Sequence, residues 1–276
     1  MTLPREWLLS TARAEREAMG RSIQYTEPRF WEMDSVLPGW RNRDIVAHLA
    51  AGEQAAAESL GGQEPAELEA ARKAAGGSFS VDAFNASSVA RRAQSPLREV
   101  IGEWGTAADL LLSRAAALEP AEYESRRVTW VAGELRVPYL LQSRVMEWWL
   151  HGEDLRAGVE LPPRRQHEPI HCTIDLAIRM IPYALGLAGL SFPGKSMRFI
   201  VEGSGQGDWH YGLAPHETPP PAKRPDAAVE ARGYDLAMVA GRRFDADEMV
   251  ARGAFVVGGD RRLAETVLRH LRAFAA

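Results

Sequence analysis

Two side chains that could share one ion lie four residues apart in the stretch EWWLHGEDLRAG, namely Glu147 and His151. Four residues advance an α-helix by about 400° in rotation and about 6 Å along its axis, so both side chains point in nearly the same direction. A carboxylate and an imidazole placed in this way form either an ordinary helical pair or two of the ligands of a metal ion. Spacing alone leaves both interpretations open.

A third side chain with ligand chemistry lies earlier in the chain, in the stretch RDIVAHLAAGE. Ile45, Leu49 and Gly52 mark an inward helical face there, and His48 falls on the same side. Taken alone, such a histidine is more often a hydrogen-bonded core residue than a ligand. Two inward imidazoles and an inward carboxylate nevertheless all need partners, because an unpaired buried charge costs several kcal/mol. One shared divalent ion would be a partner for all three.

Long helices must position these residues. Apolar residues recur at helical spacing over residues 4–23, 41–60 and 79–118. The third segment is long enough for two helices or for one helix broken near Ser95-Pro96. Residues 123–138 are irregular, so we expect a loop with extended pieces that brings Pro138 into the first turn of the next helix. Because each helix has one apolar stripe to bury, a four-helix bundle is the economical arrangement.

The pattern changes after Pro162 and Pro163. A bridging helix is predicted over residues 169–190, with a kink at Pro182. Strands are predicted over residues 196–203, 207–215 and 227–233, and helices over residues 234–241, 245–253 and 261–274. We therefore predict a helical bundle over residues 1–163 and a small α+β domain over residues 164–276, with its helices packed on an antiparallel sheet. The chain as a whole is predicted to be α+β and mainly α.

Composition limits the kinds of partner. The net charge of −4 gives no general attraction to phosphate backbones or anionic lipids, so nucleic acid is not an expected partner. The one cysteine, Cys172, cannot form an intramolecular disulfide, and we interpret it as buried filler in a protein of a reducing compartment. The N-terminal stretch MTLPREWLLSTARAERE carries charges too early for a signal peptide, and no later run approaches about 18 uncharged apolar residues. We expect a cytoplasmic protein with no membrane segment.

Taken together, the two motifs resemble those of the mycothiol-dependent maleylpyruvate isomerase family, within the larger DinB-like metalloenzyme superfamily. In GWRNRDIVAHLAAGE, a tryptophan is followed by Asp, apolar residues and His-Leu, as in the family pattern. The stretch EWWLHGEDLRAG is similar to the family's Glu-x-x-x-His-x-x-Asp helix, and weaker similarity in VDAFNASSVARR and MVAGRRF extends the resemblance over most of the chain. The resemblance implies a DinB-like four-helix bundle followed by an α+β domain similar to the sterol-carrier fold.

The resemblance further implies that His48, Glu147 and His151 are the protein ligands of a divalent metal, with zinc as the family's choice. Two imidazoles and one carboxylate with an open fourth position are typical of catalytic zinc, although this ligand set also allows iron(II), nickel or manganese. At the open position the resemblance places the thiol of mycothiol, the small thiol of actinobacteria. A metal lowers the pKa of a coordinated thiol, which favours the nucleophilic thiolate.

Three further residues acquire predicted roles. Arg242 resembles a family arginine that reaches the site, so we predict that it acts in catalysis and contacts the thiol cofactor or a substrate carboxylate. Asn85 resembles a family position in the stretch FNA, and we assign it to cofactor binding. Arg144, one turn before Glu147, is predicted to neutralise that carboxylate or to meet a substrate carboxylate in catalysis; a surface salt bridge is the alternative.

Two aspartates are candidates for orienting the imidazoles. Asp44 lies one turn before His48, and Asp154 lies three residues after His151, so each could accept a hydrogen bond from a ring N–H. The alternatives are a charge at a helix N-terminus for Asp44 and a solvated helix face for Asp154.

The leading hypothesis is a metal-dependent isomerase or S-transferase that activates a low-molecular-weight thiol, with mycothiol as the implied thiol. Its expected partners are that thiol and an electrophilic small molecule, and it would be a monomer or a homodimer. A metal-dependent hydrolase and a non-catalytic module that binds a small molecule are the alternatives. Dependence of activity on thiol separates the hydrolase from the leading hypothesis, and metal content separates the binding module.

Overall fold

The computed structural model describes residues 2–24, 26–74, 76, 80–131, 133–214 and 224–273. The chain divides into two compact units, Met1–Arg164 with Ala276, and Arg165–Ala275. That residues 1–163 and 164–276 form independent domains stays a prediction.

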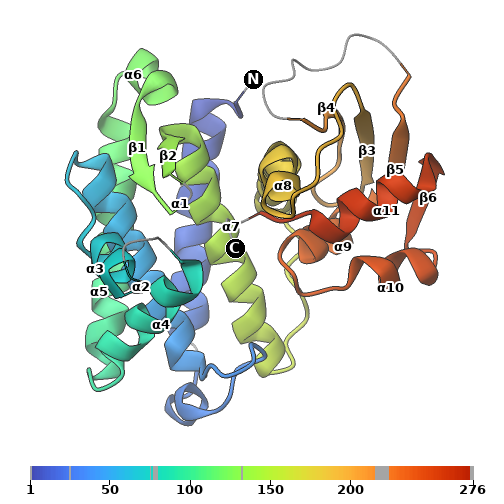
Figure 1. The fold of residues 1–276 in the computed structure, drawn as a ribbon. Helices are drawn as coiled ribbons and strands as arrows, with labels where there is room; N and C mark the ends of the chain where they lie inside the picture. The colour runs from blue at the N-terminus through green and yellow to red at the C-terminus, as the bar shows by residue number, and fades with distance from the viewer. Residues whose placement is uncertain are drawn as a thin grey trace. The chain divides into compact units, whose positions relative to one another are not determined.

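Four long helices form the first unit's core (Figure 1). They are α1 (Arg5–Gln24), α2 (Asn42–Leu60), α5 (Leu97–Ala117) and α7 (Val137–Gly158). Helices α1 and α2 each contact both α5 and α7, so the four close into a bundle. Leu8, Leu49, Leu111 and Trp148 lie fully buried inside it, one from each helix. The predicted fold class, α+β and mainly α with an N-terminal four-helix bundle, is confirmed.

Shorter elements complete the first unit. They are η1 (Pro28–Glu32), α3 (Ala66–Ala74), α4 (Val81–Arg92), α6 (Pro120–Ser125) and the antiparallel hairpin of β1 (Arg127–Trp130) and β2 (Gly133–Arg136). The segment predicted over residues 79–118 is two helices, because Pro96 cannot continue α4 and instead precedes the first residue of α5. The hairpin corresponds to the predicted loop with extended pieces. Helix α3 was not predicted, because its sequence is short, alanine-rich and charged.

Helix α7 is buried over most of its length and all around its circumference, including its polar residues Gln142, Arg144, His151 and Asp154. Pro138 occupies its first turn, where a missing N–H costs no helical hydrogen bond. A helix without a solvent face cannot leave its charged side chains to water, so each of them requires a partner inside the protein.

In its described residues, the second unit combines one sheet with four helices. Its elements are α8 (His167–Leu187), β3 (Ser196–Glu202), β4 (Gly207–Gly212), β5 (Ala227–Arg232), α9 (Gly233–Ala240), α10 (Ala246–Ala251), β6 (Phe255–Gly259) and α11 (Arg261–His270). The strand order is β4-β3-β5-β6. Met197, Phe199 and Val201 of β3 are buried while Arg198 and Glu202 are exposed, so one face of the sheet is covered. Helices α8, α9 and α11 pack against its strands.

Two details of the predicted sheet were wrong. Strands β3 and β5 pair in parallel, whereas the β3–β4 and β5–β6 pairs are antiparallel. A fourth strand, β6, lies at the edge; its sequence FVVGG is short and glycine-rich, which obscures the alternation of apolar and polar residues that marks a strand. The proline-rich stretch between β4 and β5 falls largely in residues 215–223, outside the described part of the chain.

Helix α8 runs through Pro182 as one continuous helix. By length and composition alone it could cross a membrane, which the sequence analysis did not anticipate. However, 61% of its most apolar window is buried inside the structure, as in the core helix of an ordinary domain. The helix is therefore weak evidence for a membrane span.

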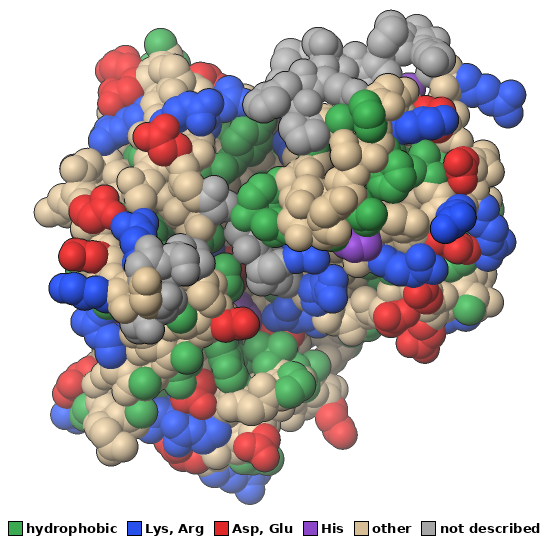
Figure 2. Space-filling view, in the orientation of Figure 1, with side chains coloured by type: hydrophobic (Ala, Val, Ile, Leu, Met, Phe, Trp, Pro, Cys, Tyr) green, Lys and Arg blue, Asp and Glu red, His purple; other side chains and the backbone are tan. Residues whose placement is uncertain are grey.

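On the face shown in Figure 2, Lys and Arg side chains are interspersed with those of Asp and Glu. Among the described residues on that face, no large area carries a single sign of charge. This agrees with the small net charge of −4. The absence of nucleic acid among the partners stays a prediction.

Gly233 offers a test of packing in the second unit. An added Cβ at this residue would overlap the carbonyl oxygen of Ser204, so Gly233→Ala should lower the free energy of unfolding by about 1–3 kcal/mol. Gly186→Ala is the matched control, because nothing lies within 4 Å of the added Cβ in that exposed helical position. It should leave stability unchanged or raise it by up to about 1 kcal/mol. Urea unfolding measures both, and equal effects would contradict the packing argument.

Candidate metal centre

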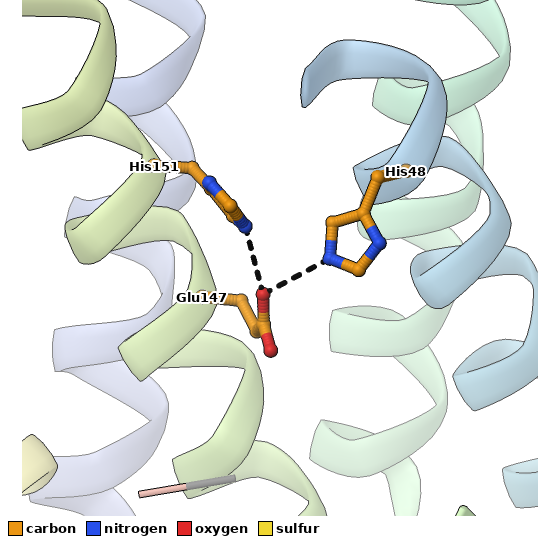
Figure 3. A group of neighbouring side chains, drawn as sticks. All are labelled: His48, Glu147 and His151. Carbon is orange, nitrogen blue, oxygen red and sulfur yellow. Dashed lines mark hydrogen bonds and ion pairs between the residues drawn. The ribbon is translucent and has the colours of Figure 1, made fainter. Parts of the chain in front are cut away.

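The two predicted ligand motifs meet inside the helical bundle. His48 comes from α2, and Glu147 and His151 come from successive turns of α7 (Figure 3). Glu147 Oε2 lies 3.2 Å from Nε2 of His48 and 3.2 Å from Nε2 of His151. One ligand atom from each of the three residues lies within 4.8 Å of the other two. The fold therefore brings together the three residues that the sequence analysis selected.

These distances fit a small divalent ion. Ligand atoms about 2.0–2.2 Å from a tetrahedral zinc ion lie about 3.3–3.5 Å from one another, close to the separations between Glu147 Oε2 and the two imidazole nitrogens. Nitrogen and oxygen donors without a thiolate also suit catalytic zinc or another borderline metal. The residues present fit such an ion, and three protein ligands would leave one position for another molecule.

Burial and charge act in opposite directions on the three candidate ligands. Burial alone would raise the pKa of Glu147, but hydrogen bonds from His151 and His48 and the charge of Arg144 hold this pKa well below its usual value. Burial lowers the pKa of His48, and Glu147 offsets this only in part. The carboxylate is therefore ionised and the His48 imidazole neutral at pH 7, which is the protonation state that a metal requires of both.

The two imidazoles are oriented by different means. His151 Nδ1 lies 2.9 Å from Oδ2 of Asp154, whose side chain is 2% exposed. The predicted hydrogen bond between these residues is present. Burial would lower the pKa of His151, but the bonds to Asp154 and Glu147 raise it overall. In its protonated form His151 can therefore donate from Nδ1 to Asp154 and from Nε2 to Glu147. A metal would take the place of the Nε2 proton, while Asp154 would keep the proton on Nδ1.

Of the two interpretations of Asp44, the charge at a helix N-terminus is confirmed and the orienting bond to His48 is not found. Its carboxylate accepts hydrogen bonds from the backbone N–H and the guanidinium of Arg41, so it caps the N-terminus of α2. His48 Nδ1 is buried and has no hydrogen-bond partner among the described residues. Instead, the rings of Trp40 and Phe84 lie with centroids 5.3 Å and 6.5 Å from that of His48. The His48 imidazole is therefore held by aromatic packing and by the contact of Nε2 with Glu147, without a carboxylate at Nδ1.

The alternative of a surface salt bridge for Arg144 was also wrong, because the side chain is only 5% exposed. Its guanidinium lies 3.6 Å from Glu147 Oε1 and 3.4 Å from Glu53 Oε1, and it stacks over Trp130 at 4.8 Å from the ring centroid. The position is consistent with neutralising Glu147. A direct role of Arg144 in catalysis stays a prediction.

The sequence analysis did not single out Glu53. This carboxylate is fully buried on α2 and accepts a hydrogen bond from Trp148 Nε1 at 2.8 Å. Burial raises its pKa to about 7, although Arg144 and Trp148 act against the increase. The one signal in the sequence was that Glu53 follows the inward Gly52 in the His48 motif. Its pairing with Arg144, on another helix, could not be identified without the fold.

Asn85 and Arg242 are the remaining predicted residues, and neither belongs to the cluster of His48, Glu147 and His151. Asn85 lies on α4 beside Phe84, and its Oδ1 is buried with no hydrogen-bond partner in the described part of the chain. Arg242 belongs to the second unit, where its backbone is left-handed (φ 61°) and its Nη1 lies 3.4 Å from the carbonyl oxygen of Arg269. The roles of Asn85 and Arg242 in catalysis and cofactor binding stay predictions.

Comparison with known proteins agrees with this geometry. The family described as "Mycothiol maleylpyruvate isomerase N-terminal domain" matches residues 12–156, more than half of the chain. A crystal structure of the mycothiol-dependent maleylpyruvate isomerase is similar with a TM-score of 0.61 and 17% sequence identity, over 93% of each chain. The crystal structure of a histidine-to-alanine mutant of that isomerase has a TM-score of 0.59 and 18% identity, over 87% of this chain and 90% of the other. At these identities the likeness establishes the fold. No curated protein matches the chain.

The ligand set predicts a specific pattern of metal content. Purified protein should carry close to one equivalent of zinc, and His48→Ala and His151→Ala should each reduce this below about one tenth, because two remaining ligands hold zinc weakly. Mass spectrometry of the metal measures it. His210→Ala is the control, since this histidine lies on β4 and its Nε2 lies 2.9 Å from Ser196 Oγ. Equal zinc in all variants, or none in the wild type after incubation with zinc, would contradict the assignment.

The buried carboxylate of Glu53 predicts a pH effect on metal-free protein. Its pKa is about 7 in the folded state against 4.5 in the unfolded chain, so the folded state holds this proton more tightly. The contribution of Glu53 to stability is therefore fully present below about pH 4.5 and is lost as pH rises to about 7, by up to about 3 kcal/mol. Glu53→Gln should remove this loss, so its stability relative to wild type should increase from pH 5 to pH 8. Urea unfolding at each pH measures the stability of both proteins, and a constant difference between them from pH 5 to pH 8 would contradict the raised pKa. Glu230→Gln, which changes an exposed residue of β5, is the control.

Proposed function

The chain belongs to the mycothiol maleylpyruvate isomerase family, and on that premise we propose that it is a metal-dependent enzyme that activates mycothiol for attack on an electrophilic substrate. The observation that carries the proposal is the convergence of His48 Nε2, His151 Nε2 and Glu147 Oε2 within the bundle. A structural zinc site would have four protein ligands, most often cysteines, whereas these three would leave a position for a thiol.

The chain's own residues have separate tasks in this proposal. His48, Glu147 and His151 would hold the metal, which supplies a lowered thiol pKa and hence a thiolate at neutral pH. Asp154 keeps the proton of His151 on Nδ1, so that Nε2 stays available. Trp40 and Phe84 pack around His48 and keep water from the imidazole face. No side chain is then needed as a general base for the thiol.

The reaction that we propose is a cis–trans isomerisation. The sulfur adds to one carbon of the substrate's double bond, and the remaining single bond rotates. Expulsion of the same sulfur then restores the double bond in the other geometry, so the thiol is regenerated and no other reactant is consumed. The solved relative named as a maleylpyruvate isomerase supports this order over permanent S-transfer. Maleylpyruvate, converted to fumarylpyruvate, is therefore the first substrate to test, and Arg242 remains the candidate for contact with a substrate carboxylate.

We further infer that the enzyme works in the cytoplasm as a monomer or homodimer, with the small thiol and an electrophile as its partners. Family membership supports the thiol and the small-molecule substrate. The small net charge supports the exclusion of nucleic acid as a partner.

Dependence on thiol provides the decisive test of function. Zinc-loaded protein with maleylpyruvate should form fumarylpyruvate only when mycothiol is added, with at least about a 100-fold lower rate without it, since the nucleophile is then missing. The change in ultraviolet absorbance follows the reaction, and His151→Ala is the inactive control.

Other outcomes would replace the proposal. Consumption of one mycothiol per electrophile would identify an S-transferase. Hydrolysis of an ester or amide without any thiol would identify a metal-dependent hydrolase. Full zinc occupancy with no turnover of any electrophile would favour the binding module.

A further inference from the structure

The two oxygens of the Glu147 carboxylate have different environments. Oε2 lies 3.2 Å from the Nε2 atoms of both His48 and His151. Oε1 lies on the side of Arg144, 3.6 Å from Nη2. A carboxylate can rotate about its last bond and could present either oxygen, or both, to an ion. In this structure the arginine and the imidazoles select one orientation.

Arg144 is itself held by two further residues, Glu53 and Trp130. Its Nη1 lies 3.4 Å from Glu53 Oε1, and its guanidinium lies over the ring of Trp130. Gly52, the residue before Glu53, leaves the space for this guanidinium: an added Cβ there would lie 2.6 Å from Nη1. The side chain is almost completely buried, so its charge must be matched by neighbouring carboxylates.

Glu53 is placed to share this charge. It is fully buried and accepts a hydrogen bond from Trp148, the residue that directly follows Glu147 on α7. Among the described residues, Glu147 and Glu53 are the carboxylates that pair with Arg144, so without Glu53 the arginine would keep Glu147 alone. The guanidinium would then attract both oxygens of Glu147, as in a bidentate pair, and draw Oε2 away from the imidazoles.

We propose that Glu53 is a positioning residue of the metal centre: through Arg144 it holds the Glu147 carboxylate so that Oε2 alone faces His48 and His151. This inference rests on the proposed function, because the orientation matters only if the three residues bind a metal. Substrate and thiol need not touch Glu53 or Arg144. The expected signature is a change in metal affinity and ligand geometry.

A second buried arginine in the same bundle provides a matched control. Arg164 lies 2.8 Å from Glu15 Oε2 and 3.3 Å from Glu153 Oε1, and its side chain is 10% exposed. It therefore joins two buried carboxylates, as Arg144 does. No ion pair or hydrogen bond of the described structure links Arg164 to His48, Glu147 or His151.

The test compares Arg144→Lys, Gly52→Ala and Glu53→Ala with Arg164→Lys. Lysine keeps the charge of Arg144 but cannot contact two carboxylates with a planar fork, and the alanine at residue 52 displaces the guanidinium without removing it. Each of the three changes should weaken zinc binding by about 10–100-fold in competition with a chromophoric chelator. Each should also shift the visible absorption of the cobalt(II)-substituted protein. Glu53→Gln keeps an oxygen acceptor but not the charge that pairs with Arg144, so it should weaken zinc binding in the same direction as Glu53→Ala.

Arg164→Lys should lower the melting temperature of metal-free protein while changing zinc affinity by less than about twofold. If Glu53→Ala does not fold, Arg144→Lys and Gly52→Ala decide. Unchanged zinc affinity and cobalt spectra in these two folded variants would overturn the inference and leave the metal site intact. An equal loss of affinity in Arg164→Lys would also overturn it, because the effect would then be general. Absence of zinc binding by the wild type would overturn the proposed function and this inference together.

Discussion

Burial of one carboxylate determines the polar architecture of the helical bundle. An isolated carboxylate in such an environment costs several kcal/mol or takes up a proton. Glu147 stays ionised because imidazoles approach one of its oxygens and Arg144 approaches the other. These partners are buried too and need partners of their own, which Asp154 provides for His151 and Glu53 provides for Arg144. The result is a connected polar network inside the bundle.

The network treats the two histidines unequally, and this has a chemical consequence. A carboxylate behind an imidazole raises its basicity and strengthens it as a ligand, as Asp154 does for His151. His48 has aromatic neighbours instead, and burial keeps it neutral. With a carboxylate behind His151 but not behind His48, the site would still bind a metal. It would neutralise less of the metal's positive charge than two imidazoles that were both backed by carboxylates. A more positive ion lowers the pKa of a coordinated thiol further.

Local periodicity was sufficient to predict the four long helices and the convergence of Glu147 with His151, because both depend on contacts within a few residues. Their meeting with His48, 99 residues from Glu147, required the additional similarity of two ordered motifs. The parallel pairing of β3 with β5 could not be predicted, since strand order depends on contacts far apart in the sequence. The two interpretations of Asp44 could not be separated by sequence, because a residue one turn before His48 near a helix start could either bond the imidazole or cap the helix.

Residues on a helix buried all around pose the hardest problem for sequence analysis. Such a helix has no separate apolar and polar faces, so the position of a charged residue along it does not predict whether its side chain is exposed. Arg144 on α7 and Arg164 in the segment that follows α7 each pair with two glutamates, and the sequence identifies neither set of partners. Of these carboxylates, Glu147 beside Arg144 also faces two imidazoles. Arg144 can orient a metal ligand because its partner Glu147 also contacts both histidines. Such contacts of a partner residue are known only from the fold.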